Sequence, residues 1–305
     1  MTQWQPLQPG DLVEIIAPGM PPKKGTLNGI PKFLKTWGLK PIIRKDLLGK
    51  DLICANSQEK RMAHLKKALS NKEAKMIWCM RGGYGSLHLL PELKKIRKTS
   101  PKIFMGLSDI TSLHTFLVQM WGWSTIHGCN IDKFARGEAT SAEMNRFKKI
   151  LFGEETSVSN TIKPLNKMAQ KNGTIKGSII GGNLITLQSS FGTPFQMKTR
   201  NQILFFEDIG ERAYRVDRVL TQMDQLGMFR SVKAVIFGQF TGGNEPGGAS
   251  KVPQLLKQFA QAQKFPVFSN FPSGHGNNQH PLPLGTQAKI FSGKTSKIEI
   301  HTGAK

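Results

Sequence analysis

Three short segments place side chains capable of covalent chemistry where apolar runs end. The segment GLSDIT carries Ser108, FEDIGE carries Glu207 and SGHG carries His275. A serine hydroxyl can attack a carbonyl, a histidine can take its proton, and a carboxylate can orient the histidine. These residue types, in the chain order Ser…Glu…His, predict acyl transfer through a serine nucleophile.

Ser108 stands between an apolar run and a following apolar helix pattern. Such a turn exposes the hydroxyl and places the N–H of Asp109 beside a developing oxyanion at a helix N-terminus. The setting is similar to a nucleophile elbow, although the second glycine of G-x-S-x-G is missing. The alternative is that Ser108 or Asp109 only caps the helix.

The segment RGGYG at 81–85 has three glycines in four positions. Glycines allow close backbone approach and leave N–H groups exposed. The segment is not a nucleotide-binding P-loop, because no Gly-Lys-Ser/Thr follows it. It is either an anion-stabilising turn or a flexible turn without a role in chemistry.

Two carboxylates, Glu207 and Asp208, emerge together where an apolar run ends. One of them could orient a histidine, or both could cap the next helix. Among the seven histidines, His275 has the clearest loop setting, because glycines flank it. The pattern predicts His64 on a solvated helix face and His127 in the interior. No His-x-x-Glu-His, CxxC or other metal-ligand spacing is present, so no metal is expected.

The elements that must position these residues alternate between strand and helix patterns. Apolar runs at 11–17, 74–80 and 102–107 indicate buried strands, and the patterns at 57–69 and 111–122 indicate helices. This alternation predicts βαβ units on a parallel sheet. Ligands collect at the carboxyl ends of strands in such sheets, which is where Ser108 lies.

The chain length and patterning predict two domains. We expect an N-terminal domain at 1–130, a polar connection at 131–173 and a C-terminal α/β domain at 174–305. In the second domain we expect strands at 202–206 and 232–238, a helix at 214–226 and a closing hairpin at 286–301. No run is long and apolar enough to span a membrane, so no membrane insertion and a cytoplasmic location are expected.

Charge is the compositional outlier of this 305-residue chain. It has 43 Lys plus Arg against 20 Asp plus Glu, a net charge of +23. Such a surface attracts anions, including small anionic substrates. Basic residues are spread along the chain and only two tyrosines are present, which argues against a nucleic-acid-binding protein. The three cysteines, at 54, 79 and 129, favour a reducing compartment.

Five co-linear motifs resemble the LD-carboxypeptidases, a serine peptidase family. This family includes murein tetrapeptide carboxypeptidases and microcin-C self-immunity peptidases. The resemblance runs from about residue 11 to residue 300. The motifs are RGGYG at 81–85, GLSDIT at 106–111, GGNL at 181–184, FEDIGERAYRVDR at 206–218 and GHGNNQHPLPLG at 274–285.

The resemblance implies a flavodoxin-like N-terminal domain, a smaller C-terminal α/β domain, an active site between them and a homodimer. It assigns the nucleophile to Ser108, the acid to Glu207 and the base to His275. The oxyanion donors would be the N–H groups of Asp109 and of Gly83. No cofactor or metal is implied.

The implied substrate is an anionic murein tetrapeptide from cell-wall turnover, from which terminal D-alanine is removed. The alternative is an immunity peptidase that hydrolyses peptidyl or aminoacyl nucleotides. All five tryptophans lie in the N-terminal half, which argues against a tryptophan platform for a nucleotide in the C-terminal domain. The sequence departs from the family pattern at Ala17-Pro18-Gly19, at Cys54-Ala55-Asn56 and at HGCN, where Cys129 is a candidate near-site thiol.

Overall fold

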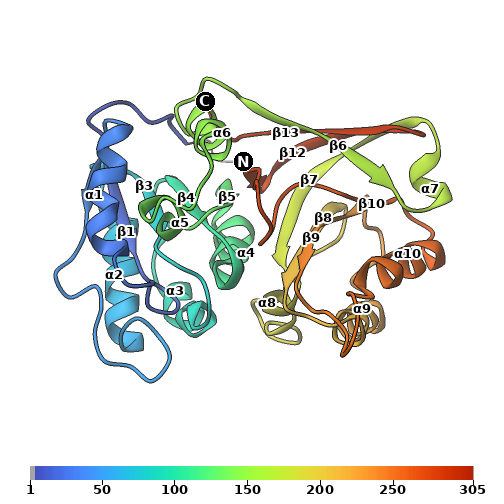
Figure 1. The fold of residues 1–305 in the computed structure, drawn as a ribbon, viewed down its shortest axis with the longest axis horizontal. Coiled ribbons are helices and arrows are strands. Elements are labelled where there is room, and N and C mark those ends of the chain that lie inside the picture. The colour runs from blue at the N-terminus through green and yellow to red at the C-terminus, as the bar shows by residue number, and fades with distance from the viewer. Residues whose placement is uncertain (1–3, 305) are drawn as a thin grey trace.

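The chain folds into two lobes that lie side by side (Figure 1). The structure is a computed structural model, and it describes residues 4–304. One lobe is built on a six-stranded sheet and the other on a closed barrel of seven strands. The protein is therefore an α/β protein with a parallel-sheet N-terminal domain, and its C-terminal domain contains a mixed β-barrel.

The N-terminal sheet has five parallel strands in the order β2-β1-β3-β4-β5. The expected strand–helix alternation is confirmed here. The strands are β1 (Leu12–Ile16), β2 (Lys40–Ile42), β3 (Ala74–Cys79), β4 (Ile103–Gly106) and β5 (Thr125–His127). The helices of this lobe are α1 (Thr26–Thr36), α2 (Gln58–Ser70), α3 (Leu90–Lys94) and α4 (Thr111–Trp121), with 3-10 turns η1 (Ser86–Leu89) and η2 (Ser108–Ile110).

The closed barrel was not predicted from the sequence. Its strands follow the order β10-β6-β13-β12-β7-β8-β9. They are β6 (Ser157–Pro164), β7 (Gly173–Asn183), β8 (Gln202–Ile209), β9 (Ala234–Thr241), β10 (Val267–Ser269), β12 (Thr286–Ser292) and β13 (Ser296–His301). Strands β7 to β10 run parallel, and β6, β13 and β12 close the barrel by antiparallel pairing.

The polar segment 131–173 contributes to this barrel. Strand β6 alternates exposed and buried residues along its length, so only one of its faces is apolar. Antiparallel strands often have one solvent-exposed face. The polar residues of that face led us to predict a connecting segment here. The helices from this point on are α5 (Ile131–Ala135), α6 (Ser141–Leu151), α7 (Lys167–Gln170), α8 (Leu184–Gln188), α9 (Ala213–Gln225) and α10 (Val252–Ala262).

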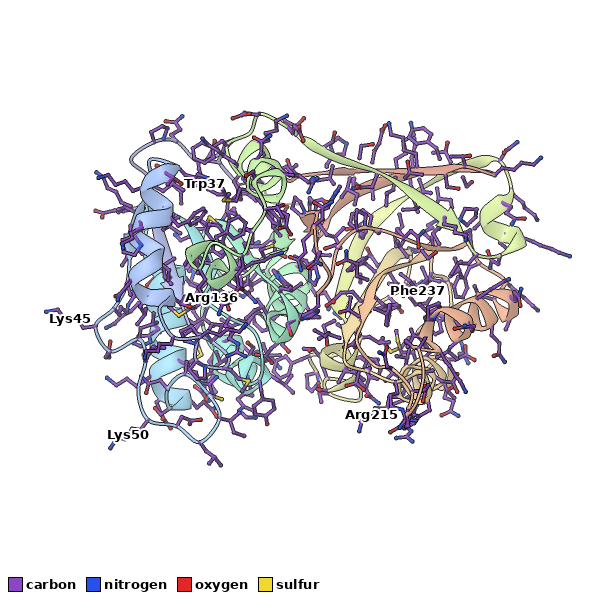
Figure 2. All side chains as sticks on the ribbon, viewed as in Figure 1. Trp37, Lys45, Lys50, Arg136, Arg215 and Phe237 are labelled. Atoms are coloured by element: carbon purple, nitrogen blue, oxygen red, sulfur yellow. The ribbon has the colours of Figure 1, made fainter. Side chains whose placement is uncertain are left out.

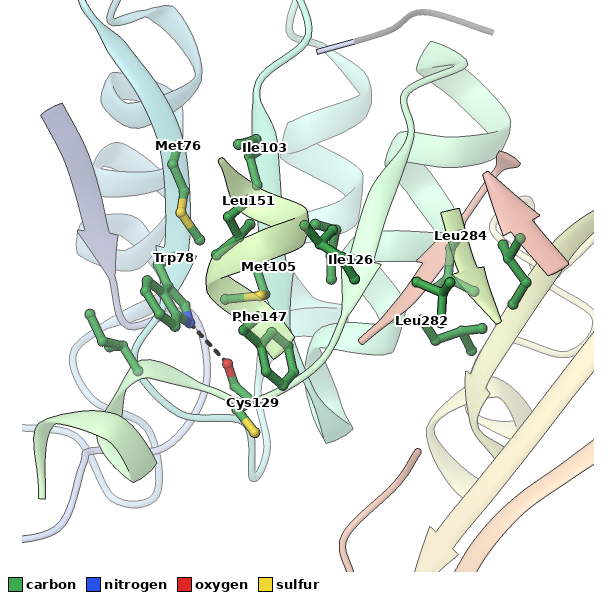
Figure 3. Close-up of a cluster of buried hydrophobic side chains, with 14 of the residues drawn as sticks. Met76, Trp78, Ile103, Met105, Ile126, Cys129, Phe147, Leu151, Leu282 and Leu284 are labelled. Atoms are coloured by element: carbon green, nitrogen blue, oxygen red, sulfur yellow. Dashed lines mark hydrogen bonds between the residues drawn. The ribbon is translucent and has the colours of Figure 1, made fainter. Parts of the chain in front are cut away.

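One hydrophobic cluster runs through both lobes, and each lobe also has a cluster of its own. Strand β11 (Leu282–Leu284) comes from the C-terminal part of the chain, yet it pairs antiparallel with β5 at the edge of the N-terminal sheet. Phe147 of α6 packs beside Met105 and Ile126 of that sheet, and Trp78 Nε1 donates to the Cys129 carbonyl at 2.9 Å (Figure 3). The pairing of β11 with β5 joins the two lobes, whereas the contacts of Phe147 and Trp78 lie on the N-terminal sheet.

Basic side chains are spread over both lobes. Lys45 and Lys50 point outward from the N-terminal lobe, and Arg215 does so from α9, whereas Phe237 is buried inside the second lobe (Figure 2). Within residues 4–304, no helix has the length and apolar character that crossing a membrane requires.

Candidate active site

Ser108 opens a sharp turn between β4 and α4. The turn is the 3-10 helix η2, and the φ of Ser108 is 69°. A positive φ is strained for a residue with a Cβ, and nucleophile turns between strand and helix carry such strain. Neither η2 nor α4 has a side-chain cap. The alternative reading of Ser108 and Asp109 as helix caps therefore has no support in the structure.

The glycine turn after β3 packs directly against Ser108. A Cβ on Gly82 would lie 2.6 Å from the Leu107 carbonyl oxygen and 2.8 Å from Ser108 Cβ, so a larger residue cannot fit without movement. Gly83 follows with a φ of 89°, and in the described part of the chain its N–H donates to no other group. The two expected oxyanion donors, Gly83 and Asp109, thus stand on segments in contact.

The Asp109 side chain ties these segments together. Its Oδ2 accepts a hydrogen bond from the Ser86 N–H at 2.8 Å, at the start of η1. Burial of this carboxyl raises the pKa of Asp109. The residue therefore has a structural contact through its side chain while its N–H lies in the first turn of η2, where helix N–H groups have no partner inside the helix.

Glu207 and His275 meet directly. His275 Nδ1 lies 2.6 Å from Glu207 Oε2. Glu207 is fully buried at the end of β8, whereas the His275 side chain is 14% exposed on the loop after β10. A buried carboxylate in this position orients the imidazole and leaves its other nitrogen free to face a ligand. The structure thus brings together two of the three residues predicted for catalysis.

The contact with Glu207 raises the pKa of His275. Burial by itself would lower the pKa, but the negative charge of Glu207 and its hydrogen bond raise it above the ordinary value. The imidazolium form is therefore stabilised, as a general base that must hold a proton requires.

The loop that carries His275 is held by a residue that the sequence analysis missed. Gln239 of β9 donates its N–H to the Ser273 carbonyl at 2.9 Å and accepts the Gly276 N–H on its side chain at 2.9 Å. Gly274 has a φ of 138°, and a Cβ there would lie 3.0 Å from Glu207 Oε2. The loop can approach Glu207 this closely only with glycine at 274.

Asp208, the neighbour of Glu207, has different hydrogen-bond partners. Its carboxylate accepts hydrogen bonds from Asn183 Nδ2 at 3.0 Å and from the Ile185 N–H at 2.9 Å. Burial, followed by the charge of Glu207, raises the pKa of Asp208 to about 7. Asp208 thus anchors the start of α8, and neither carboxylate caps α9, which has no side-chain cap.

Two buried histidines lie behind Glu207. His127 is fully buried, as predicted, and its Nε2 is 3.9 Å from Glu207 Oε1. His114 is also buried, and its Nε2 is 2.9 Å from the Gly106 carbonyl. Burial lowers the pKa of both rings, that of His114 to about 4. The expectation for His64 was wrong, because its ring is buried beside Asp46 at 3.1 Å.

Ser108 follows the strand that pairs with β5, the strand of His127, and it has no hydrogen bond to His275 or Glu207 in residues 4–304. Gly106 pairs with His127 in the sheet register, and His127 adjoins Glu207. Across the lobes, Thr111 Oγ1 accepts the N–H of Asn183, which pairs with Glu207 in the barrel register. Within residues 4–304, the hydrogen bond of the His275 ring goes to Glu207, and none joins it to Ser108. Catalytic hydrogen bonds are often long before substrate binds.

Two other expectations concern metals and thiols. In the described chain, no group of three or more His, Cys, Asp or Glu residues is arranged to hold a metal ion. Cys129 is buried and donates to Gln279 Oε1 at 2.7 Å, and burial raises its pKa to about 12. The thiol is therefore a packed structural group in the protonated form.

Comparison with known proteins identifies the family. A model of the LD-carboxypeptidase N-terminal domain matches residues 13–128, and a model of the LD-carboxypeptidase C-terminal domain matches residues 176–290. A Rickettsia conorii protein named "putative carboxypeptidase" is 38% identical over 82% of this chain and 78% of its own length. A Bacillus subtilis protein named "probable murein peptide carboxypeptidase" is 30% identical over 96% of this chain and 93% of its own.

A further relative and two solved structures are also similar to this chain. The murein tetrapeptide carboxypeptidase of Pseudomonas aeruginosa is 28% identical over 94% of each chain. The muramoyltetrapeptide carboxypeptidase of Oxalobacter formigenes superposes with a TM-score of 0.84 at 27% identity, covering 96% of this chain and all of that one. An MccF-like protein of Bacillus anthracis shares the fold, with a TM-score of 0.86 at 22% identity over 99% of this chain and all of that one. The chain belongs to the LD-carboxypeptidase family of serine hydrolases.

Proposed function

We propose that this protein is a murein tetrapeptide carboxypeptidase that removes terminal D-alanine through an acyl-enzyme on Ser108. The observation that carries the proposal is the 2.6 Å contact between His275 and the fully buried Glu207, with the strained Ser108 turn on the facing lobe. The names of the relatives from Pseudomonas aeruginosa and Oxalobacter formigenes support the choice of substrate.

In the first step, His275 Nε2 takes the proton from Ser108 Oγ as the oxygen attacks the carbonyl before the terminal D-alanine. Glu207 holds the Nδ1–H tautomer and stabilises the imidazolium that forms. The raised pKa of His275 suits this role. His275 must start neutral, so activity should fall as the pH drops through that raised pKa.

The tetrahedral oxyanion would be held by the N–H groups of Gly83 and Asp109. The loss of one such donor costs about 3–4 kcal/mol of barrier in serine hydrolases. His275 then returns the proton to the leaving amine of D-alanine. Water releases the acyl group by the reverse proton route, with His275 again as base.

The arrangement of the molecule fits this assignment. We take residues 1–130 and 174–305 as two domains joined by 131–173, with β6 of the joining segment built into the barrel. The parallel strand order β2-β1-β3-β4-β5 supports a flavodoxin-like description of the first domain. We further propose a homodimer in the cytoplasm, in which peptides from cell-wall turnover are processed.

The test is incubation with L-Ala-γ-D-Glu-meso-diaminopimelate-D-Ala, followed by mass spectrometry. We expect the wild type to release one alanine and Ser108→Ala to release none while keeping its circular dichroism spectrum. Unchanged release by Ser108→Ala would overturn the nucleophile. Hydrolysis of an aminoacyl sulfamoyl adenosine, with the tetrapeptide untouched, would replace murein peptides with nucleotide-linked substrates.

A further inference from the structure

The two oxygens of the Glu207 carboxylate differ in their hydrogen bonding. Its Oε2 faces His275 at 2.6 Å, but in residues 4–304 its Oε1 is buried without a hydrogen-bond partner. A buried carboxylate oxygen without a donor carries a large desolvation cost. A donor near Oε1 would satisfy this buried oxygen.

His127 lies near this oxygen and can act as a donor. Its Nε2 is 3.9 Å from Glu207 Oε1, and both of its ring nitrogens lack a partner in the described chain. The ring packs edge-on against Phe205 with centroids 5.6 Å apart, which fixes its plane beside β8. A neutral imidazole carries one N–H, and placing that proton on Nε2 directs it toward Oε1.

We infer that His127 is a positioning residue that donates its Nε2–H to Glu207 Oε1, directly after a small approach or through one water. The inference rests on the proposed function, in which Glu207 orients His275. It adds a residue on β5 to the hydrogen-bonded pair of His275 and Glu207. A second donor would hold the carboxylate plane, as outer-shell partners do for buried ligating groups.

The inferred bond has a consequence for His275. Donation by His127 stabilises the negative charge of Glu207, which makes the carboxylate a weaker base toward its other partner. Without the donor, proton uptake by the His275–Glu207 pair becomes more favourable. The acidic limb of the pH–rate profile should then move to higher pH, because His275 stays protonated longer.

Other titratable groups face the same region. The charge of Asp208 from β8 raises the pKa of His275, and the pKa of Asp208 itself is raised to about 7. His114 from α4 lies behind His127, with ring centroids 6.2 Å apart. The test must therefore separate His127 from both Asp208 and His114.

The experiment compares His127→Leu, which lacks a donor, with His127→Gln, whose Nε2 can replace the imidazole Nε2–H. For tetrapeptide cleavage we expect His127→Leu to lower kcat about ten- to a hundredfold, the loss that removal of a hydrogen-bond partner of a metal ligand typically causes, with KM unchanged and the acidic limb of the pH–rate profile at higher pH. His127→Gln should restore much of kcat and the original limb. Two controls should show neither this loss of kcat nor this shift of the acidic limb. They are His114→Leu, which also removes a buried imidazole ring, and Asp208→Asn.

Dependence on Glu207 is tested by a double-mutant cycle. In the Glu207→Gln background, His127→Leu should cause little further loss of kcat. Equal losses in both backgrounds, or a wild-type kcat and limb in folded His127→Leu, would overturn the inference. A wild type that releases no alanine would count against the proposed function instead.

A readout independent of activity is 15N NMR of histidine-labelled wild type. We expect His127 to be neutral at pH 7 with its proton on Nε2, because burial lowers its pKa, and we expect its Nε2 signal to shift in Glu207→Gln. A proton on Nδ1 would contradict the inferred bond. This measurement needs no His127 variant, so it tests the inference even if every His127 variant fails to fold.

Discussion

At the residue scale, two adjacent carboxylates have different partners. Strand alternation points Glu207 and Asp208 to opposite faces of β8, so one meets His275 and the other meets the start of α8. The residue types alone left the choice between them open, and the family resemblance assigned the role to Glu207. The assignment to Glu207 now has a geometric basis in the contact with His275.

We expect Glu207→Gln to lower kcat about 10³- to 10⁴-fold, the loss seen when the acid of a serine triad becomes an amide. The amide cannot stabilise the imidazolium and favours the wrong tautomer. Asp208→Asn is the matched control and should lower kcat far less. Steady-state kinetics of both folded variants gives the two kcat values. A larger loss of kcat in Asp208→Asn than in Glu207→Gln would mean that Asp208 is the acid.

Asp208 should also make stability depend on pH. Its pKa is about 7 in the folded protein against 3.8 ordinarily, so folding favours the protonated form. The stabilisation is fully present below the ordinary pKa and is lost as the pH rises from about 4 to about 7. In urea unfolding, the stability of the wild type relative to Asp208→Asn should fall between pH 4.5 and pH 8. A constant difference would contradict the assignment.

The residues predicted from the sequence were those at strand ends beside glycine. Ser108, Glu207 and His275 were predicted as catalytic residues because of that setting. Gln239 and His127 could not be predicted in that way, because their contacts depend on the register between strands far apart in the chain. A glutamine inside a strand or a lone interior histidine has no local signal that names its partner.

At the element scale, the glycine turn after β3 sets the position of Ser108. We expect Gly82→Ala to lower kcat strongly, since a Cβ would lie 2.6 Å from the Leu107 carbonyl oxygen and 2.8 Å from Ser108 Cβ. The backbone cannot yield as a flexible side chain would. Gly248→Ala is the control, because a Cβ there meets nothing within 4 Å. Equal activity of the two variants would show that the turn adapts.

The parallel sheet could be predicted because strands such as β3 are almost continuously apolar and are followed by helix patterns. The barrel could not be predicted, because its closing strands are half-exposed and pair with segments distant in sequence. Strand β6 pairs with β13, more than a hundred residues later. Alternation of apolar residues identifies a strand and says nothing of which strand it joins.

At the scale of the whole molecule, the two lobes are linked into one structural unit. Strand β11 completes the edge of the N-terminal sheet, and residues of α6 lie in the same core cluster as that sheet. Neither lobe can unfold without exposing part of the other's core.

We therefore expect a single unfolding transition in urea. Tryptophan fluorescence reports on the N-terminal half, because the five tryptophans lie at 4, 37, 78, 121 and 123. Far-UV circular dichroism reports on both lobes. The two curves should coincide. A fluorescence transition separated from the circular dichroism transition would show that the lobes unfold independently.

The central claim is that Ser108, His275 and Glu207 act as one unit, and a fluorophosphonate probe tests it most directly. Such a probe forms a covalent bond with an activated serine, and peptide mass spectrometry locates the adduct. We expect a single adduct on Ser108, formed rapidly by the wild type, and little or none in His275→Ala or Glu207→Gln. An adduct on another residue, or labelling of Ser108 at the wild-type rate in His275→Ala, would contradict the account.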